Sequence, residues 1–155
     1  MSRNHVHYRV AALGLALGLA VAPMAVADDP IKLFQEEVPA LKDGSRIAIA
    51  DVERAILDAC KRRRFDAKAE APGVISARWT HGSHWFDVSI EFTDSAYSIR
   101  YKDSERMDYN EKRQRIDDSY NEYVAALSEH IDADFERALK RLKVAQKEAR
   151  KLASS

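Results

Sequence analysis

Three short segments in the middle of the chain alternate apolar and polar residues, and they restrict the fold more than any other feature. The segments cover 74–81, 84–92 and 96–102. Alternation of this kind predicts half-buried strands. The dipeptides Gly82-Ser83 and Asp94-Ser95 lie between the segments and suit two-residue hairpin turns. We therefore predict a three-stranded antiparallel meander.

The two turns together place apolar side chains on one side of all three strands. The first turn sets Trp79 opposite Phe86. The same turn sets Ile75 opposite Ile90, and the second turn sets Ile90 opposite Ile99. A shift of one residue would move all of these side chains to the other face, so the register is well specified. The other face can then meet water.

One acidic side chain on the polar face falls between two cations. The predicted register sets Asp87 opposite Arg78 on one neighbouring strand and opposite Lys102 on the other. A carboxylate in this position could act as a catalytic acid. We interpret it as part of a structural ion pair, because exposed pairs are frequent and each stabilises a protein by only about 0–1 kcal/mol.

Two segments around the strands have the spacing of amphipathic helices. The first is expected over 51–63, with Val52, Ile56 and Cys60 on one apolar stripe. It ends in the basic run 61–64, where cations meet the negative end of the helix dipole. We interpret this run as a solvated helix end. The alternative is a grip on an anionic partner such as lipid headgroups or a cell-wall polymer.

The second helix is long, beginning at Asp117 or Asp118 and reaching Leu152. Its apolar stripe up to Ile131 can cover the sheet. Residues 132–155 contain seven basic and four acidic side chains, so this extension has a net charge of +3. It either enlarges the core or projects as an interaction helix. Its stripe continues at heptad spacing through Phe135, Ala138, Leu142, Ala145, Ala149 and Leu152.

These elements predict an α+β fold, in which two helices cover one face of a three-stranded antiparallel meander. The α+β domain is expected over 51–131, with a linker at 66–73 that ends in Pro72-Gly73. Residues 28–50 show little periodicity and are predicted to form an extended N-terminal arm. Residues 132–155 form the basic C-terminal helical extension.

The first 27 residues have the three parts of a secretory signal peptide. Arg3 and Arg9 form the basic part, and an apolar run covers 10–22. Small residues at Ala25 and Ala27 allow cleavage after Ala27. The apolar run is shorter than the roughly 20 residues that a spanning helix needs. We therefore predict a periplasmic or secreted protein with no transmembrane segment once the signal is removed.

Charge and cysteine content limit the partners of the mature chain. Cleavage removes two arginines and leaves 23 basic and 25 acidic residues, which argues against a general nucleic-acid binder. Cys60 is the single cysteine, so no disulfide can form within the chain. Its place on an apolar stripe favours a buried thiol, and an intermolecular disulfide is the alternative.

The histidines beside the first turn are a candidate metal site. His81 and His84 face each other across the predicted hairpin and could hold Zn²⁺ or Cu²⁺. Two ligands make a weak site, because structural zinc takes four and catalytic zinc takes three and a water. A turn-flanking structural role is the plainer interpretation. No nucleophile elbow, phosphate loop or dinucleotide fingerprint occurs, so neither enzyme activity nor a cofactor is predicted.

The polar connector before the long helix is the candidate contact surface. Arg106, Met107, Tyr109 and Asn110 lie in it and are not needed for a strand or helix stripe. Binding residues concentrate on loops that a rigid scaffold carries. We therefore predict that this loop, residues 103–115, contacts a partner.

Several short segments carry a recognisable order of residues: Glu70-Ala71-Pro72-Gly73-Val74-Ile75-Ser76-Ala77-Arg78, Tyr97-Ser98-Ile99-Arg100-Tyr101-Lys102-Asp103-Ser104, Asp108-Tyr109-Asn110 and Tyr120-Asn121-Glu122-Tyr123-Val124. Together they resemble a family of small exported proteobacterial proteins and lipoproteins of unknown function. The resemblance covers about 52–131. It implies export and an α-β-β-β-α order of elements, and it implies no activity and no site residues.

The chain departs from that family in three places. Arg63-Arg64-Phe65 stands where members commonly have Arg-Gly-aromatic. A left-handed Arg64 would cost about 1 kcal/mol more than glycine. The cysteine that anchors some members to lipid is missing, which implies a released product. The helix beyond Ile131 is longer than is usual in the family.

Our leading functional prediction is a non-enzymatic periplasmic module that binds a protein or a cell-envelope component. The 103–115 loop and the C-terminal helix are its expected surfaces, and a homodimer could form through that helix or a sheet edge. A small metal-binding or hydrolytic protein that uses His81 and His84 is one alternative, and a structural envelope protein without a ligand is another. Deletion of residues 133–155 is expected to leave a folded domain.

Overall fold

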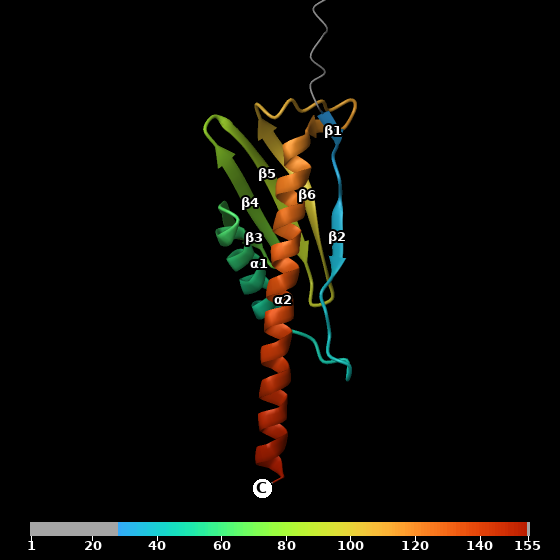
Figure 1. The fold of residues 1–155 in the computed structure, drawn as a ribbon, viewed down its shortest axis with the longest axis vertical. Helices are drawn as coiled ribbons and strands as arrows, with labels where there is room; N and C mark the ends of the chain where they lie inside the picture. Colours follow the sequence, from blue (N-terminus) through green and yellow to red (C-terminus); the bar gives the residue numbers. More distant parts are fainter. Residues whose placement is uncertain (1–27, 155) are drawn as a thin grey trace, which may run out of the picture.

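The structure is a computed structural model that describes residues 28–154. The predicted signal peptide and its cleavage site at Ala27 lie outside the described residues. The described chain is α+β, as predicted (Figure 1). In chain order its elements are β1 (Asp28–Pro30), β2 (Phe34–Glu37), α1 (Ile49–Arg62), β3 (Phe65–Ala71), β4 (Val74–His81), β5 (His84–Phe92), β6 (Ala96–Glu105), β7 (Arg115–Asp117) and α2 (Asp118–Ala153).

Five strands form one antiparallel sheet in the order β2-β6-β5-β4-β3, and β1 pairs separately with β7. The prediction of a three-stranded sheet is therefore wrong. The predicted strands are its centre, and β2 and β3 flank them. The segment 66–73, predicted as a linker, supplies most of β3. In β3 the residues on the core side are Phe65, Ala67 and Ala69, which lie opposite residues of β4. Two of the three are small alanines, so the sequence shows little apolar alternation.

The predicted cross-strand pairs of the apolar face are present. Trp79 lies opposite Phe86, and Ile75 lies opposite Ile90. Ile90 in turn lies opposite Ile99. Because these three strands keep their predicted alignment, their apolar side chains form the floor of the core.

A β-bulge changes the pairing on the polar face. Asp87 lies opposite Asp103 and not opposite Lys102, because β6 contains one extra residue beside the Asp87–Val88 step. Arg78 Nε still lies 2.6 Å from Asp87 Oδ1. Lys102 Nζ instead lies 3.0 Å from Glu70 Oε1 on β3. The predicted triad of charges is therefore two separate ion pairs.

Both helices pack against the apolar face of the sheet and against each other (Figure 1). The rings of Phe86 and Tyr120 meet edge to face at 4.9 Å and join β5 to α2. Val52 and Ile56 of α1 are fully buried in the same cluster. Ile31 and Phe34, from the N-terminal part of the described chain, are partly buried against this cluster.

The long helix α2 begins beside the sheet and runs well past its edge (Figure 1). Asp117 caps its start by accepting a hydrogen bond from the Ser119 backbone N–H at 3.0 Å. Burial continues through Phe135 and Ala138, beyond the predicted domain boundary at Ile131. We define the projecting extension as residues 139–153, in which no residue is fully buried. Neither helix described between residues 28 and 154 is long and apolar enough to cross a membrane.

Candidate functional site

The predicted contact loop is tightly held to the domain. Met107 is 3% exposed and belongs to the core cluster. Its carbonyl accepts a hydrogen bond from the backbone N–H of Asp117 at 2.9 Å, which ties the loop to the start of α2. Met107 is therefore a packing residue and is not available to a partner.

The other three predicted loop residues differ in exposure. Arg106 and Asn110 are exposed, and Arg106 Nη1 donates to Ser83 Oγ at 3.1 Å. The half-buried ring of Tyr109 lies 4.6 Å from the ring of Tyr101. Of the four predicted residues, Arg106 and Asn110 are thus the two whose side chains lie mostly in solvent.

The two histidines of the first turn are neighbours, as predicted. His81 lies directly opposite His84 across the β4–β5 hairpin, and both are exposed. The ring of His81 stacks at 6.0 Å from Trp79. Within residues 28–154 no group of three or more histidine, cysteine or acidic side chains could hold a metal ion. A metal at this turn would therefore have two protein ligands, fewer than zinc sites use.

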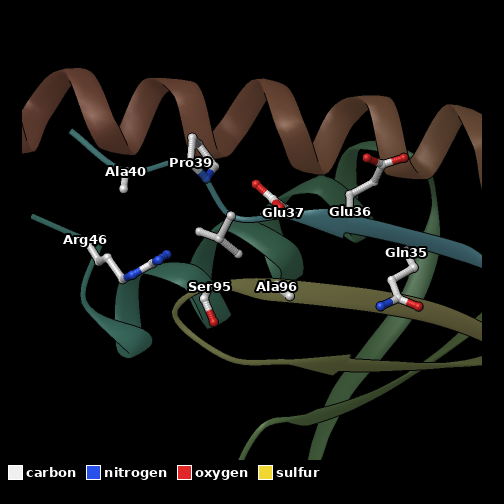
Figure 2. A pocket seen from close by; sticks show the side chains of 9 residues that line it. Gln35, Glu36, Glu37, Pro39, Ala40, Arg46, Ser95 and Ala96 are labelled. Carbon is white, nitrogen blue, oxygen red and sulfur yellow. The ribbon is translucent and has the colours of Figure 1, made fainter. Parts of the chain in front are cut away.

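A cleft of about 770 Å³ lies where β2 ends beside the β5–β6 turn (Figure 2). Glu36 and Glu37 enter from β2, and Arg46 enters from the segment before α1. Arg46 Nη1 donates to the carbonyl of Asp94 at 3.4 Å, so part of its donor capacity is used. Two carboxylates beside one bonded guanidinium give this cleft no clear preference for an anion or a cation.

A smaller basic hollow of about 250 Å³ lies at the C-terminal end of α1. Its cations come from the last turn of the helix, and its aromatic wall comes from β4 and α2. Trp79 and Tyr123 form that wall, with ring centroids 4.1 Å apart. The side chains around the hollow are Arg62, Arg63, Arg64, Trp79, Thr80, His81 and Tyr123. This surface contains the basic run that the sequence singled out.

The projecting extension presents a second basic surface. Its cations Lys140, Lys143, Lys147, Arg150 and Lys151 recur at steps of three, four, three and one. Residues at such steps lie on one face of a helix. The extension therefore has a continuous basic stripe along one side.

No family model, no curated protein and no solved structure matches this chain. The resemblance to exported proteobacterial proteins accordingly stays a prediction. The basic hollow and the basic stripe are two surfaces of the described residues that packing of the domain does not require.

Two other groups that could be reactive, the Cys60 thiol and the Tyr97 hydroxyl, are buried. Burial raises the pKa of the Cys60 thiol to about 12, so the thiolate is scarce at neutral pH. The Tyr97 hydroxyl bonds to Ser128 Oγ at 2.7 Å and to Asp132 Oδ1 at 2.8 Å, and burial raises its pKa as well. We interpret this network as structural, because it joins β6 to α2 within the core.

Sequence reasoning missed one buried charge on the long helix. Asp134 lies in the polar part of the helix pattern, where carboxylates are usually solvated, yet it is 7% exposed. It forms ion pairs with Arg62 of α1 and with Arg137 one turn further along α2. No local signal marks it, because its burial depends on α1 crossing α2 at that point.

Proposed function

We propose that this protein is an exported, non-enzymatic binding module that docks on a bilayer containing anionic phospholipid. The projecting extension, residues 139–153, is the docking surface. The single observation that supports the proposal is its basic stripe, which lies on a helix that runs past the sheet and whose side chains are mostly exposed (Figure 1).

The charge of the extension is strongly one-sided. Six basic residues, Lys140, Arg141, Lys143, Lys147, Arg150 and Lys151, stand against the single acid Glu148. Arg150 Nη2 lies 3.3 Å from Asp43 of the loop before α1. Lys140, Lys143 and Lys147 have no carboxylate within ion-pair distance among the described residues. Their charge is therefore available to a partner.

The reach of the extension suits a surface better than a pocket. A helix rises 1.5 Å per residue, so these residues span about 22 Å. The extension also has exposed apolar side chains beside the basic stripe, including Val144 at 55% and Leu152 at 78% exposure. A helix with a basic face and a modest apolar face can lie along the interface of an anionic bilayer.

Export supports the same proposal from the other end of the chain. The signal-like residues 1–27 would deliver the domain to a compartment bounded by membranes. Each lysine or arginine close to an anionic bilayer contributes about 1 kcal/mol of attraction. Several such side chains on one helix would hold the released protein at the membrane without a lipid anchor.

Vesicle sedimentation tests the proposal with the exported chain, residues 28–155. Vesicles of phosphatidylcholine with phosphatidylglycerol should bind the protein, and vesicles of phosphatidylcholine alone should not. The triple change Lys140→Gln, Lys143→Gln and Lys147→Gln should lower the partition coefficient about a hundredfold, since three attractions of about 1 kcal/mol are lost. High salt should release the wild-type protein because it screens exposed charges.

A matched variant separates position from net charge. Lys32→Gln, Lys68→Gln and Lys112→Gln remove three exposed cations that lie outside α2. This control should bind vesicles nearly as well as the wild type. The proposal is wrong if the control loses as much binding as the helix variant. It is equally wrong if the protein ignores anionic vesicles and instead forms dimers that depend on the helix lysines.

A further inference from the structure

The basic hollow at the end of α1 carries positive charge that the domain itself does not neutralise. Arg62 is paired with Asp134. Arg63 and Arg64 follow it directly, and none of the described side chains around the hollow is acidic. The half-buried Arg63 and the exposed Arg64 therefore line a small hollow that has no carboxylate among its described walls.

One of these arginines has a buried donor that is left unused. The Nε of Arg63 is buried and has no hydrogen-bond partner among the described residues. A buried donor without an acceptor lowers stability, because the group has lost water and gained nothing in return. Arg63 also lines the hollow, so unused hydrogen-bonding capacity lies beside it.

The next arginine is held in a backbone conformation that suits another residue. Arg64 has φ of +61°, in the left-handed region that glycine adopts without strain. Strained positions of this kind collect at ligand sites, where the side chain is needed in place. Arg64 therefore keeps its side chain at the hollow in a backbone conformation that glycine would adopt without strain.

The remaining walls make the hollow a good environment for a small anion. The paired rings of Trp79 and Tyr123 form a rigid apolar side. Charge-assisted hydrogen bonds from arginine are stronger where water is partly excluded. Two carbonyls in the last turn of α1, those of Ala59 and Lys61, already accept hydrogen bonds from the backbone N–H groups of Arg63 and Arg64.

We propose that this hollow binds a phosphoryl group, with Arg63 and Arg64 as its principal ligands. A volume of about 250 Å³ has room for such a group and for part of a small molecule that carries it. The forked guanidinium matches phosphate oxygens in geometry. The source is either inorganic phosphate or the phosphate of a small monoester. The hollow shares no residue with the extension. Phosphate binding is therefore independent of the proposed membrane docking, and each can be tested without the other.

Nuclear magnetic resonance of the ¹⁵N-labelled chain, residues 28–155, tests the site directly. Addition of inorganic phosphate should shift the indole N–H signal of Trp79 and the Nε–H signal of Arg63, with saturation near about 1 mM. Trp85 lies on the opposite face of the sheet beside Arg78 and should not shift. Glycerol 3-phosphate forms the second arm: tighter binding than inorganic phosphate identifies a monoester site, and weaker binding identifies a site for the free ion.

Two arginine substitutions separate the hollow from net charge. Arg64→Gly should weaken phosphate binding at least tenfold and raise the melting temperature, since glycine relieves the positive φ. Arg54→Gln removes an equal charge from an exposed position earlier in α1 and should leave phosphate binding unchanged. Arg63→Gln should also weaken binding at least tenfold. The proposal is overturned if phosphate produces no shift at Trp79 and Arg63, or if Arg64→Gly binds phosphate as well as the wild type does.

Discussion

The two halves of α2 are one continuous helix, yet different forces hold them. From Asp118 to Glu136 the helix contains six acidic residues and no lysine or arginine. From Arg137 to Lys151 it contains seven basic residues and one acidic residue. The first half buries a stripe against the sheet, as most helices in proteins do. The projecting extension lacks that support and is composed mainly of alanine, leucine, lysine and arginine, which favour helix intrinsically.

This contrast teaches that a helix can change its role without a break in its hydrogen bonds. The acidic half packs on the domain, and most side chains of the basic half are exposed. The boundary between them falls at Ala138, the last buried residue. Changes on either side of that residue should therefore have unequal consequences.

Truncation at two points should give the largest difference. A chain that ends at Asp132 loses Phe135, whose ring packs edge to face with Tyr97 at 5.5 Å. Loss of a buried phenylalanine side chain costs about 3–5 kcal/mol, a large part of the stability of an ordinary domain. A chain that ends at Leu139 keeps the whole core and should remain within about 1 kcal/mol of the wild type. Urea unfolding followed by circular dichroism measures both.

This expectation replaces the one drawn from the sequence, by which deletion of residues 133–155 leaves the domain intact. Phe135 and Ala138 are core residues, so that deletion removes part of the sheet's cover. Equal stability of the two truncated chains would show that the boundary at Ala138 is wrongly placed.

Two carboxylates, one buried on α2 before Ala138 and one that pairs with the extension, should differ less in their effect on stability. Asp134→Asn removes the shared partner of Arg62 and Arg137 at a site 7% exposed, and should cost about 1–3 kcal/mol. Asp43→Asn breaks the exposed contact with Arg150 of the extension and should cost less than about 1 kcal/mol. Thermal unfolding of the two variants compares them, and a larger loss for Asp43→Asn would contradict the assignment.

The smallest expected effect is a pH dependence of stability that arises from Asp132 in the acidic half of α2. Burial raises the pKa of the Asp132 carboxyl, and the nearby carboxylates of Glu36, Glu129 and Glu136 raise it further. The hydrogen bond from Tyr97 lowers this pKa, but the net shift is upward. The folded state then holds this proton more tightly than the unfolded state, so the carboxyl lowers stability as pH rises above its ordinary value of 3.8. Asp132→Asn keeps an acceptor for Tyr97 and removes the charge.

The stability advantage of Asp132→Asn over the wild type should therefore grow between pH 3.8 and neutrality, as measured by urea unfolding. Asp118→Asn, at an exposed position of the same helix, controls for net charge. An advantage that is the same at every pH, or one shared by the control, would contradict this reading of Asp132.

The centre of the sheet was predictable because its turns and its alternation are local. Trp79 and Phe86 face each other for reasons contained in one hairpin. The flanking strands were not predictable in the same way, since β2 and β3 have little apolar contrast and are specified by the strands they join. The bulge that separates Asp87 from Lys102 was not predictable either, because the alternation of apolar and polar residues does not reveal it.

The candidate surfaces were predictable in kind more than in detail. The basic run 61–64 and the basic extension are visible as composition, because charge needs no tertiary contact to be counted. The burial of Met107 and the unpartnered Nε of Arg63 are not visible, since each depends on segments distant in sequence. Sequence alone therefore indicates where charge gathers and not which charges are already satisfied.

The pairing of the first strands with the last ones has a consequence for the order of folding. The strands β3 to β6 are joined by short turns and can pair as each hairpin is made. By contrast, Phe34 of β2 must meet Ile99, and Asp28 of β1 must meet Asp117. Contacts so distant in sequence close late, because a long loop must be ordered first. A chain that emerges N-terminus first therefore carries β1 and β2 unpaired until β6 and β7 have followed, and the two pairings that involve them form late.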